Sequence, residues 1–351
     1  MKLFTPKGRH LIGLDVSTTS VKLVELQRQQ GRYTLKSYGI ERLEPGWVVD
    51  KAIVNIEEVG EAIARLVRRC NISTKEAATA VSGSAVITKV VEMDADLNDV
   101  ERETQIRLDA EQYIPYPLSE VNLDFEVLGV SPNNPSLVQV LLAASRSENV
   151  DQRVDALAIG GLTTKVMDIE SHAVERAFAL IVDSLPDQPE IVALIDIGNN
   201  QTTLHIAKDG EFIYSREQGF GGVQLTEAIQ SRYGLAYEDA VIAKRDNTLP
   251  HGYQEEVLTP FLENAVQQIS RSLQFYFSSS QYNNVDHIVL CGGTAGLHGL
   301  ADMVQERMGG RVSVANPFAN MVVNGRVDAA QLDMDAPSLM AACGLALRSF
   351  D

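Results

Sequence analysis

Length, composition and charge exclude several classes of protein before any motif is considered. The chain has 351 residues, 45% of them hydrophobic and 22% charged, which suits a soluble protein of about two domains. Its formal net charge of −17 opposes nucleic-acid binding, because a surface that follows a phosphate backbone requires clustered Lys and Arg. We therefore expect no nucleic-acid partner.

The cysteines and the apolar segments indicate a cytoplasmic protein. Cys70, Cys291 and Cys343 are too few and too scattered for a disulfide framework or a zinc site. Residues 2–9 are partly basic, but the apolar stretch that follows is broken by Asp15, so we expect no signal peptide. No segment approaches the roughly 20 apolar residues that span a bilayer, and direct membrane insertion is not expected.

A strand-turn-strand unit occurs twice in the chain. Residues 11–26 read as a buried strand, a turn of small polar residues and a returning strand. Residues 192–207 repeat this order. A glycine turn then follows in each copy, at 30–31 and at 209–210, and opens a third strand. The repeat predicts an α/β chain made of two similar halves.

Six further elements are expected between the two copies, in the order β-α-β-β-α-β that is typical of a ferredoxin-like unit. Their expected ranges are 86–93, 99–113, 121–130, 136–144, 147–160 and 165–169. We interpret them as a subdomain inserted into the first half.

Two helices and a third apolar strand are expected beyond the second copy. The helices are predicted at 223–233 and 255–278, with an acidic, irregular stretch over 239–252. The strand at 287–290 runs directly into a Gly-Gly-Thr turn at 292–294. That turn makes a third small-residue loop at the end of a buried strand.

Asp15 and Asp196 stand near the carboxyl ends of the two repeated strands, before residues small enough for a ligand to approach the backbone. Either turn alone is more often an ordinary hairpin, but the pair and the Gly-Gly-Thr turn predict one nucleotide cleft. Two carboxylates about 4 Å apart repel by roughly 4 kcal/mol at an effective dielectric of 20. Mg²⁺ removes this conflict, since it is commonly held by one or two carboxylates and substrate phosphates. Lys22 is either a phosphate ligand or a solvated lysine.

These motifs resemble the actin-like ATPase superfamily, which includes actin, Hsp70 and hexokinase. Residues 290–297 resemble its adenosine motif, and residues 341–346 resemble its closing helix. The inserted unit resembles the subdomain of the FtsA group. More closely, residues 13–22, 112–117 and 343–351 resemble the PilM family of type IV pilus assembly, and this resemblance runs nearly end to end.

The resemblance implies an actin-like ATPase fold, with two RNase H-like halves around a nucleotide cleft and an inserted ferredoxin-like subdomain of the FtsA type. The implied segments are 1–84 for the core of the first half, 85–168 for the insert, 169–190 for a connecting helix of the first half, 191–337 for the second half and 338–351 for a C-terminal helix that returns to the first half.

The resemblance also implies roles for individual residues. Asp15 and Asp196 would hold Mg²⁺, and Lys22 would contact the phosphates of ATP. The implied nucleotide-binding residues are Asp15, Ser17, Thr18, Thr19, Ser20, Lys22, Asp196, Gly198, Asn199, Asn200, Thr202, Thr203, Gly221, Gly222, Gly292, Gly293 and Thr294.

A catalytic role is implied for Glu170, at the position where superfamily members place a residue that orients the attacking water. A glutamate in a first helical turn is also commonly present for the helix dipole, so both interpretations stay open. Asn199 and Asn200 replace a smaller pair in the superfamily pattern and narrow the room at the terminal phosphate. We therefore expect ATP binding, with weak or absent hydrolysis.

The partner implied by the resemblance is the short N-terminal cytoplasmic segment of the inner-membrane protein PilN, held as an extended peptide in a groove between the first half and the insert. Ile114, Pro115 and Tyr116 are expected to lie at this groove, or to form a rigid turn that ends a helix. Binding would recruit the chain to the inner membrane and link the membrane complex to other pilus proteins and to the motors. Self-association is left open.

Two alternative functions share the same fold. A small-molecule kinase requires a base and a polar pocket beside the terminal phosphate, and the first half offers no convincing base. An FtsA-like division protein typically carries an amphipathic membrane-binding tail, whereas here an apolar helix at 339–347 is followed by four residues. We favour the pilus function.

Overall fold

The computed structural model describes residues 10–246 and 248–351. The basic start at 2–9, from which the absence of a signal peptide was argued, lies outside them. The chain divides into two compact units. Unit 1 contains the chain up to Leu23, Gly39–Ala173 and Arg348–Asp351, and unit 2 contains Val24–Tyr38 and Val174–Leu347.

A six-stranded sheet has the strand order β10-β6-β1-β2-β3-β16. Its strands are β1 (Ile12–Val16), β2 (Ser20–Gln29), β3 (Arg32–Arg42), β6 (Glu76–Val81), β10 (Thr163–Ile169) and β16 (Val322–Val323). β1 and β10 each pair with β6 in parallel. The carboxyl ends of these three strands therefore lie at one edge of the sheet, where ligands bind in open α/β sheets.

Two helices pack on this sheet, α1 (Ile56–Arg69) and α3 (Ser147–Ile159), and a short hairpin of β4 (Val48–Val49) and β5 (Ala52–Ile53) lies beside them. The helices approach closely because glycines stand at their contact: a Cβ on Gly60 would lie 2.5 Å from Ile159. The sequence patterns had not identified α1, β4, β5 or β6.

An antiparallel sheet of three strands, in the order β7-β9-β8, follows β6 in the chain. It consists of β7 (Val86–Asp94), β8 (Val121–Val130) and β9 (Leu137–Arg146), and α2 (Asp99–Asp109) packs on it. Ile106 of α2 contacts a core formed with Val138, Val140 and Leu142 of β9. Short 3₁₀ turns at Gly83–Ala85, Ala110–Gln112 and Leu118–Glu120 complete this part.

The predicted order β-α-β-β-α-β is present, but its last strand does not join this sheet. β10 pairs with β6 in the six-stranded sheet, and α3 packs against α1. The reason is the buried face of α3, because Ala156 and Leu157 belong to the core of unit 1 and carry the chain back there before β10 begins. Within the segment 85–168, the three-stranded sheet and α2 therefore lie in residues 86–146, whereas α3 and β10 join the six-stranded sheet and its core.

Unit 2 is built on a five-stranded sheet with the order β13-β12-β11-β14-β15. Its strands are β11 (Ile191–Ile197), β12 (Thr202–Lys208), β13 (Glu211–Gln218), β14 (His287–Cys291) and β15 (Arg311–Val314). Its helices include α5 (Gly222–Tyr233), α7 (Thr259–Ser279) and α8 (Leu300–Met308). The buried face of α7 packs against β11 and β14, as Val266, Ile269 and Leu273 share one core with Ile195 and Leu290.

One expectation for unit 2 was wrong. The stretch predicted as irregular contains the helix α6 (Tyr237–Arg245). Glu238 and Asp239 lie in its first turn and Lys244 and Arg245 in its last, an arrangement that favours a helix through the helix dipole. A single π-helical turn at Gln254–Leu258 precedes α7.

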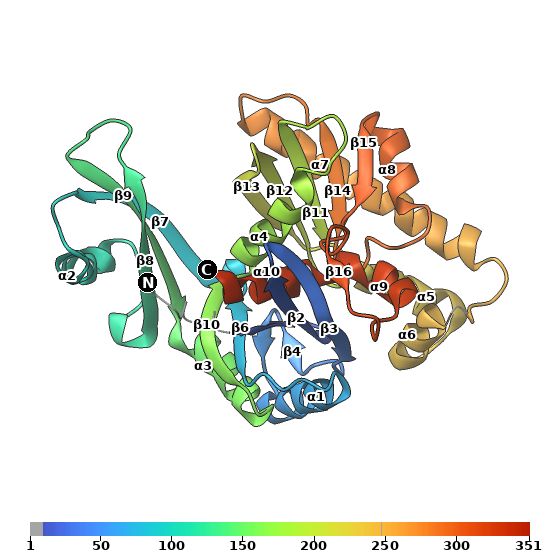
Figure 1. Ribbon diagram of the computed structural model, residues 1–351. Helices are drawn as coiled ribbons and strands as arrows, with labels where there is room; N and C mark the ends of the chain where they lie inside the picture. The colour runs from blue at the N-terminus through green and yellow to red at the C-terminus, as the bar shows by residue number, and fades with distance from the viewer. Residues whose placement is uncertain (1–9, 247) are drawn as a thin grey trace. The chain divides into compact units, whose positions relative to one another are not determined.

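The last part of the chain forms α9 (Ala329–Asp335), a 3₁₀ turn at Ala336–Leu339, α10 (Met340–Leu347) and a further 3₁₀ turn at Arg348–Phe350. The Ser349 hydroxyl donates to Leu11 O and accepts from Leu11 N, both at 2.9 Å. α4 (Glu170–Val182) begins directly after β10. None of the helices in the described residues is long and apolar enough to cross a membrane. Figure 1 labels most of the helices and strands.

Candidate functional site

Two acidic residues lie at the carboxyl edge of the parallel strands in unit 1. Asp15 is the fourth residue of β1, and Glu170 follows β10 at the start of α4. β6 joins the two strands, since it pairs with both in parallel. This edge is the place at which the sequence motifs predicted a ligand.

Asp15 and Lys22 form an ion pair in unit 1. Lys22 Nζ lies 2.8 Å from Asp15 Oδ2, and both side chains are 12% exposed. Lys22 also donates to Ser17 Oγ at 3.3 Å. The returning strand β2 therefore brings its lysine back to the first turn, so the interpretation of Lys22 as a lysine in bulk solvent is wrong.

The turn between β1 and β2 is held by its own hydrogen bonds. Ser17 N and Ser17 Oγ both donate to Ser20 O, at 2.9 and 3.0 Å, and Leu43 N donates to Thr19 O at 2.9 Å. Thr18 is half-buried and Thr19 is exposed. A ligand that approaches this turn would meet hydroxyl groups and a lysine.

Lys51 is a residue of this edge that the sequence patterns did not identify. It occupies the two-residue turn of the β4–β5 hairpin, where Asp50 and Lys51 have φ of 48° and 65°, as a type I′ turn requires. Its Nζ lies 2.9 Å from Glu170 Oε2, with the side chains 22% and 31% exposed. The turn signal at Asp50-Lys51 could have located the hairpin, but not its contact with Glu170.

Arg153 of α3 fixes the position of that hairpin. The side chain is buried, and it donates to Ala80 O at 2.7 Å, to Lys51 O at 2.7 Å and to Asn149 O at 3.0 Å. Burial lowers the pKa of the Arg153 guanidinium, while the negative charges of Glu170 and Asp15 act in the opposite direction. Arg153 thus contributes positive potential to both acidic residues.

In unit 2, Asp196 lies next to Cys291 in the parallel pair of β11 and β14. Cys291 is fully buried, and burial together with the negative charge of Asp196 raises the pKa of its thiol well above the usual range. A Cβ on Gly292, whose φ is 89°, would collide with Asp196 and with Ile197 O. The glycine therefore permits the Gly-Gly-Thr turn to pass directly over the aspartate.

Three loops of unit 2 meet around Gly198. Gly222 N and Thr294 Oγ1 both donate to Gly198 O, at 3.0 and 2.9 Å. A Cβ on Gly221 would lie 2.5 Å from Gly198 O and Asn199 O, and one on Gly222 would lie 2.8 Å from Thr294 Oγ1. These glycines let the start of α5 lie against the second turn, and a helix N-terminus is a favourable place for an anion.

The other residues of unit 2 that were predicted to bind nucleotide do not share a single contact. Asn199 Nδ2 donates to Asn200 Oδ1 at 2.6 Å, so the asparagine pair interacts with itself. The buried Thr202 hydroxyl donates to Phe220 O at 2.7 Å and supports the loop from behind. Thr203 lies opposite Glu217 in the β12–β13 pair, and a Cβ on Gly293 would meet nothing within 4 Å.

The predicted metal ligands fit a hard cation, such as Mg²⁺, that takes most of its other ligands from a bound nucleotide and from water. No group of three or more His, Cys, Asp or Glu side chains in the described residues could hold a metal ion by itself. Mg²⁺ usually keeps several waters and takes one or two carboxylates along with substrate phosphates. Asp15 and Asp196, each beside glycine or hydroxyl-rich turns, offer that kind of ligand.

A small pocket of unit 1 contains two of the three residues predicted to contact a partner peptide. Its volume is about 90 Å³, and it is lined by Ser84, Ala85, Ile87, Ile114, Tyr116, Val121, Ala144, Ser145, Arg146 and Asn149. The Arg146 guanidinium lies 5.6 Å from the centroid of the Tyr116 ring. Pro115 is exposed and does not line the pocket.

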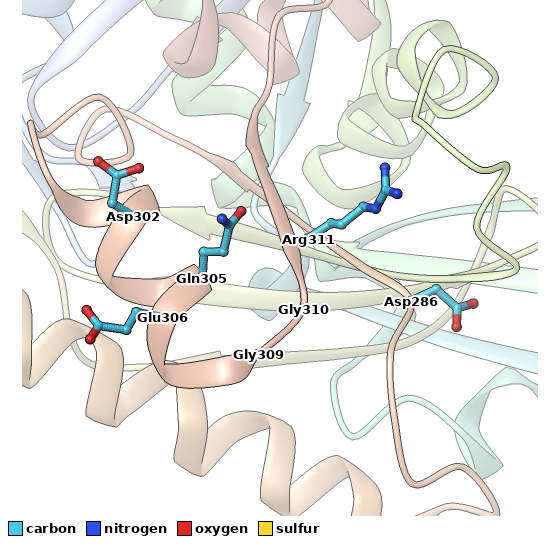
Figure 2. A pocket seen from close by; sticks show the side chains of 7 residues that line it. All are labelled: Asp286, Asp302, Gln305, Glu306, Gly309, Gly310 and Arg311. Atoms are coloured by element: carbon cyan, nitrogen blue, oxygen red, sulfur yellow. The ribbon is translucent and has the colours of Figure 1, made fainter.

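A larger and more open hollow of unit 2 contains none of the residues predicted to bind a ligand. It is lined by Asp286, Asp302, Gln305, Glu306, Gly309, Gly310 and Arg311. Figure 2 shows Asp302, Gln305 and Glu306 on α8, and Arg311 on the segment that follows this helix. Arg311 forms an ion pair with Asp187, and Asp286 accepts hydrogen bonds from Glu190 N and Ile191 N. These contacts explain Arg311 and Asp286 without a ligand.

Comparison with known proteins decides the family. The family model described as type IV pilus assembly protein PilM matches residues 13–350. The chain belongs to the PilM family. The resemblance stated from the sequence motifs is therefore confirmed.

Solved structures place the PilM-family chain in the actin-like ATPase fold. One chain of a PilM-PilN type IV pilus biogenesis complex is 27% identical, with a TM-score of 0.80 over 99% of this chain and 100% of that one. MreB 5 of Spiroplasma citri, solved with AMPPNP, is 14% identical, with a TM-score of 0.51 over 97% and 95% of the two chains. Among curated proteins, the cell division protein FtsA of Enterococcus faecalis is 22% identical over 375 residues, covering 89% of this chain and 81% of its own length.

Proposed function

We propose that this PilM-family chain binds Mg-ATP and holds the N-terminal cytoplasmic segment of a PilN protein, and so links the inner-membrane pilus complex to the motor proteins. The observation that carries the proposal is the likeness between this chain and one chain of a PilM-PilN complex, which covers 99% of this chain and 100% of that one. Type IV pilus assembly is the function of the family to which the chain belongs.

The nucleotide part of the proposal rests on two groups of residues, one in each unit. Asp15, Lys22 and the turn at 17–20 supply a carboxylate, a cation and hydroxyl groups. Asp196, with the glycine-rich loops around Gly198, supplies a second carboxylate and a helix N-terminus. MreB 5, which shares the fold, was solved with AMPPNP. Glu170 would orient the attacking water, with slow hydrolysis as the expected outcome.

The partner part rests on the pocket of Ile114 and Tyr116. Ala85 and Ala144 are among the small apolar residues that line it, and Arg146 adds a cation to the lining. A pocket of about 90 Å³ has room for one aliphatic side chain and not for a drug-sized ligand, whose pockets are usually at least about 300 Å³. Such pockets give specificity to an extended peptide.

Recruitment to the inner membrane follows from this proposal, since the chain would reach the membrane through PilN. Loss of the pocket would release the chain from the membrane complex without changing its fold. The other interpretations of this fold, a small-molecule kinase or a division protein, do not predict that result.

The test is a pull-down of the chain by an immobilised peptide with the N-terminal sequence of the PilN from the same pilus system. Ser84→Trp changes an exposed residue that lines the pocket, and it should fill the pocket and reduce capture at least about tenfold. Glu126→Trp, equally exposed on β8, is the matched control and should be captured like the wild type. Equal capture of both variants would contradict the peptide site.

A further inference from the structure

The helix α2 of the insert is apolar on two opposite faces. Its inner face packs on the three-stranded sheet through Ile106, which is 3% exposed. On the outer face, Val100 and Leu108 are 73% and 76% exposed. The spacing of four residues from Val100 to Thr104 and again to Leu108 places all three along one line of the helix. A helix of a monomeric protein usually carries one such stripe.

Thr104, at the middle of the outer stripe, adds to its apolar character. Its hydroxyl donates to Val100 O at 2.8 Å, which satisfies its polar group within the helix. The methyl group is left as the part of the side chain that a partner can contact. We call Val100, Thr104 and Leu108 the outer stripe.

The borders of the outer stripe carry different groups. Glu103 and Arg107 lie along one border and form an exposed ion pair of 2.9 Å. Glu101 and Gln105 lie along the other, and Glu101 accepts from Asn98 N at 3.0 Å in the capping box of the helix. One border therefore has a negative and a positive charge one turn apart.

We propose that the outer stripe is the contact between two copies of this chain, packed antiparallel about a two-fold axis near Thr104. In this arrangement Val100 packs against the partner's Leu108, and Thr104 packs against the partner's Thr104. The contact is isologous, as in most homodimers. The outer stripe shares no residue with the pocket of Ile114 and Tyr116.

Charge complementarity singles out a second copy as the occupant. In an antiparallel helix pair, like borders of the two stripes meet. Glu103 then lies beside the partner's Arg107, and Arg107 beside the partner's Glu103. On the other border, Gln105 lies near the partner's Gln105, so no like charges oppose each other there. The face is complementary to itself under the rotation.

A membrane surface fits this face poorly. Interfacial helices carry Lys and Arg on their polar side to attract anionic lipid, whereas α2 shows Glu101, Glu103 and a single exposed Arg107. The chain as a whole has a net charge of −17, which lipid headgroups of the same sign would repel.

The contact is small. Three side chains of one helix bury far less than the roughly 800 Å² per partner of a stable interface. We therefore expect a reversible dimer that forms at high local concentration and dissociates in dilute solution. Covalent trapping is the suitable way to detect it.

The test introduces a cysteine on the proposed axis. Thr104→Cys should form a disulfide-linked dimer under copper-phenanthroline oxidation in air at least about tenfold faster than Glu126→Cys, a matched exposed site on β8. The wild type reports any background from Cys70, the only native cysteine that is not buried in the described residues. Equal rates for the two variants would overturn the proposal.

Variants of the stripe and its border separate a specific contact from random collision. In the Thr104→Cys background, Leu108→Lys and Arg107→Glu should each lower the dimer rate to that of Glu126→Cys. Adding Glu103→Arg to Arg107→Glu exchanges both charges and should restore the rate. All three positions are exposed, so the fold should be unaffected, as thermal unfolding can check. If the double exchange does not restore the rate, the proposed antiparallel arrangement is wrong.

Discussion

Lys51 Nζ and Glu170 Oε2 lie 2.9 Å apart, although 119 positions separate them in the sequence. A hairpin turn presents the lysine, and the start of α4 presents the glutamate. Glu170 therefore does not stand alone at the edge of the sheet but is oriented by a partner. This contact bears on stability and, in the proposed function, on turnover.

Replacement of Arg153 should destabilise the fold far more than replacement of Lys51. Arg153→Met would remove the 2.7 Å hydrogen bonds from the buried guanidinium to Ala80 O and Lys51 O, and a hydrogen bond of a charged group is worth about 1.5–3 kcal/mol. Lys51→Met would remove a partly exposed ion pair worth less than about 1 kcal/mol. Urea unfolding at neutral pH measures the difference, and similar losses for both variants would show that Arg153 does not fix the hairpin.

Glycines of the second unit should differ sharply in their tolerance of a methyl group. Gly221→Ala should lower the free energy of unfolding by about 2 kcal/mol, because its Cβ would lie 2.5 Å from two backbone oxygens and overpacking typically costs about 1–3 kcal/mol. Gly219→Ala is the matched control, since its Cβ would meet nothing within 4 Å. Equal stability of the two variants would mean that the loops around Gly198 are looser than described.

Alkaline pH should destabilise the chain through its buried thiols. Burial raises the pKa of Cys291 and Cys343, and Asp196 raises that of Cys291 further. A thiol in the unfolded chain ionises near pH 8.5. The stability that a buried, protonated thiol contributes is therefore fully present below that pH, and it is lost as pH rises from there towards the higher pKa of the folded state. In this pH range, each thiol lowers the free energy of unfolding by up to about 1.4 kcal/mol per pH unit.

The measurement is urea unfolding at pH 7.5 and pH 9.5 for the wild type and for Cys343→Ala. The variant should lose less stability between the two pH values than the wild type, whatever its stability at pH 7.5. If both lose the same amount, the thiols do not cause the alkaline loss.

The strands that carry the nucleotide motifs were predictable because their signals are local. A buried apolar run, a turn of small residues and a glycine turn lie within about 20 residues in each copy. β1, β2, β11 and β12 occur where the sequence predicted them, and the glycine turns have positive φ at Gly31 and Gly210.

Contacts between distant segments were not predictable in the same way. Arg153 reaches Ala80 and Lys51 across 73 and 102 positions, and nothing in the helical pattern of α3 indicates those partners. The order of elements similarly did not reveal that β10 pairs with β6, because order alone does not fix strand pairing. The charge pattern of α6 was available in the sequence, but its acidic character led to an interpretation as irregular chain.

Lys51 should also affect turnover through Glu170. If Lys51 orients the glutamate, Lys51→Met and Glu170→Gln should each lower single-turnover ATP hydrolysis, and the double variant should show little further loss. Two residues that act as a unit show such non-additivity. Additive losses in radiolabelled ATP hydrolysis would mean that the two side chains act separately.

In the proposed function, Asp15 and Asp196 serve one Mg-ATP. Titration calorimetry with Mg-ATP should give one site per chain, and Asp15→Asn and Asp196→Asn should each weaken binding at least about tenfold. Asp183→Asn, at an exposed position, should bind like the wild type. Unchanged affinity in either of the first two variants, with the fold intact, would contradict a shared metal and nucleotide site.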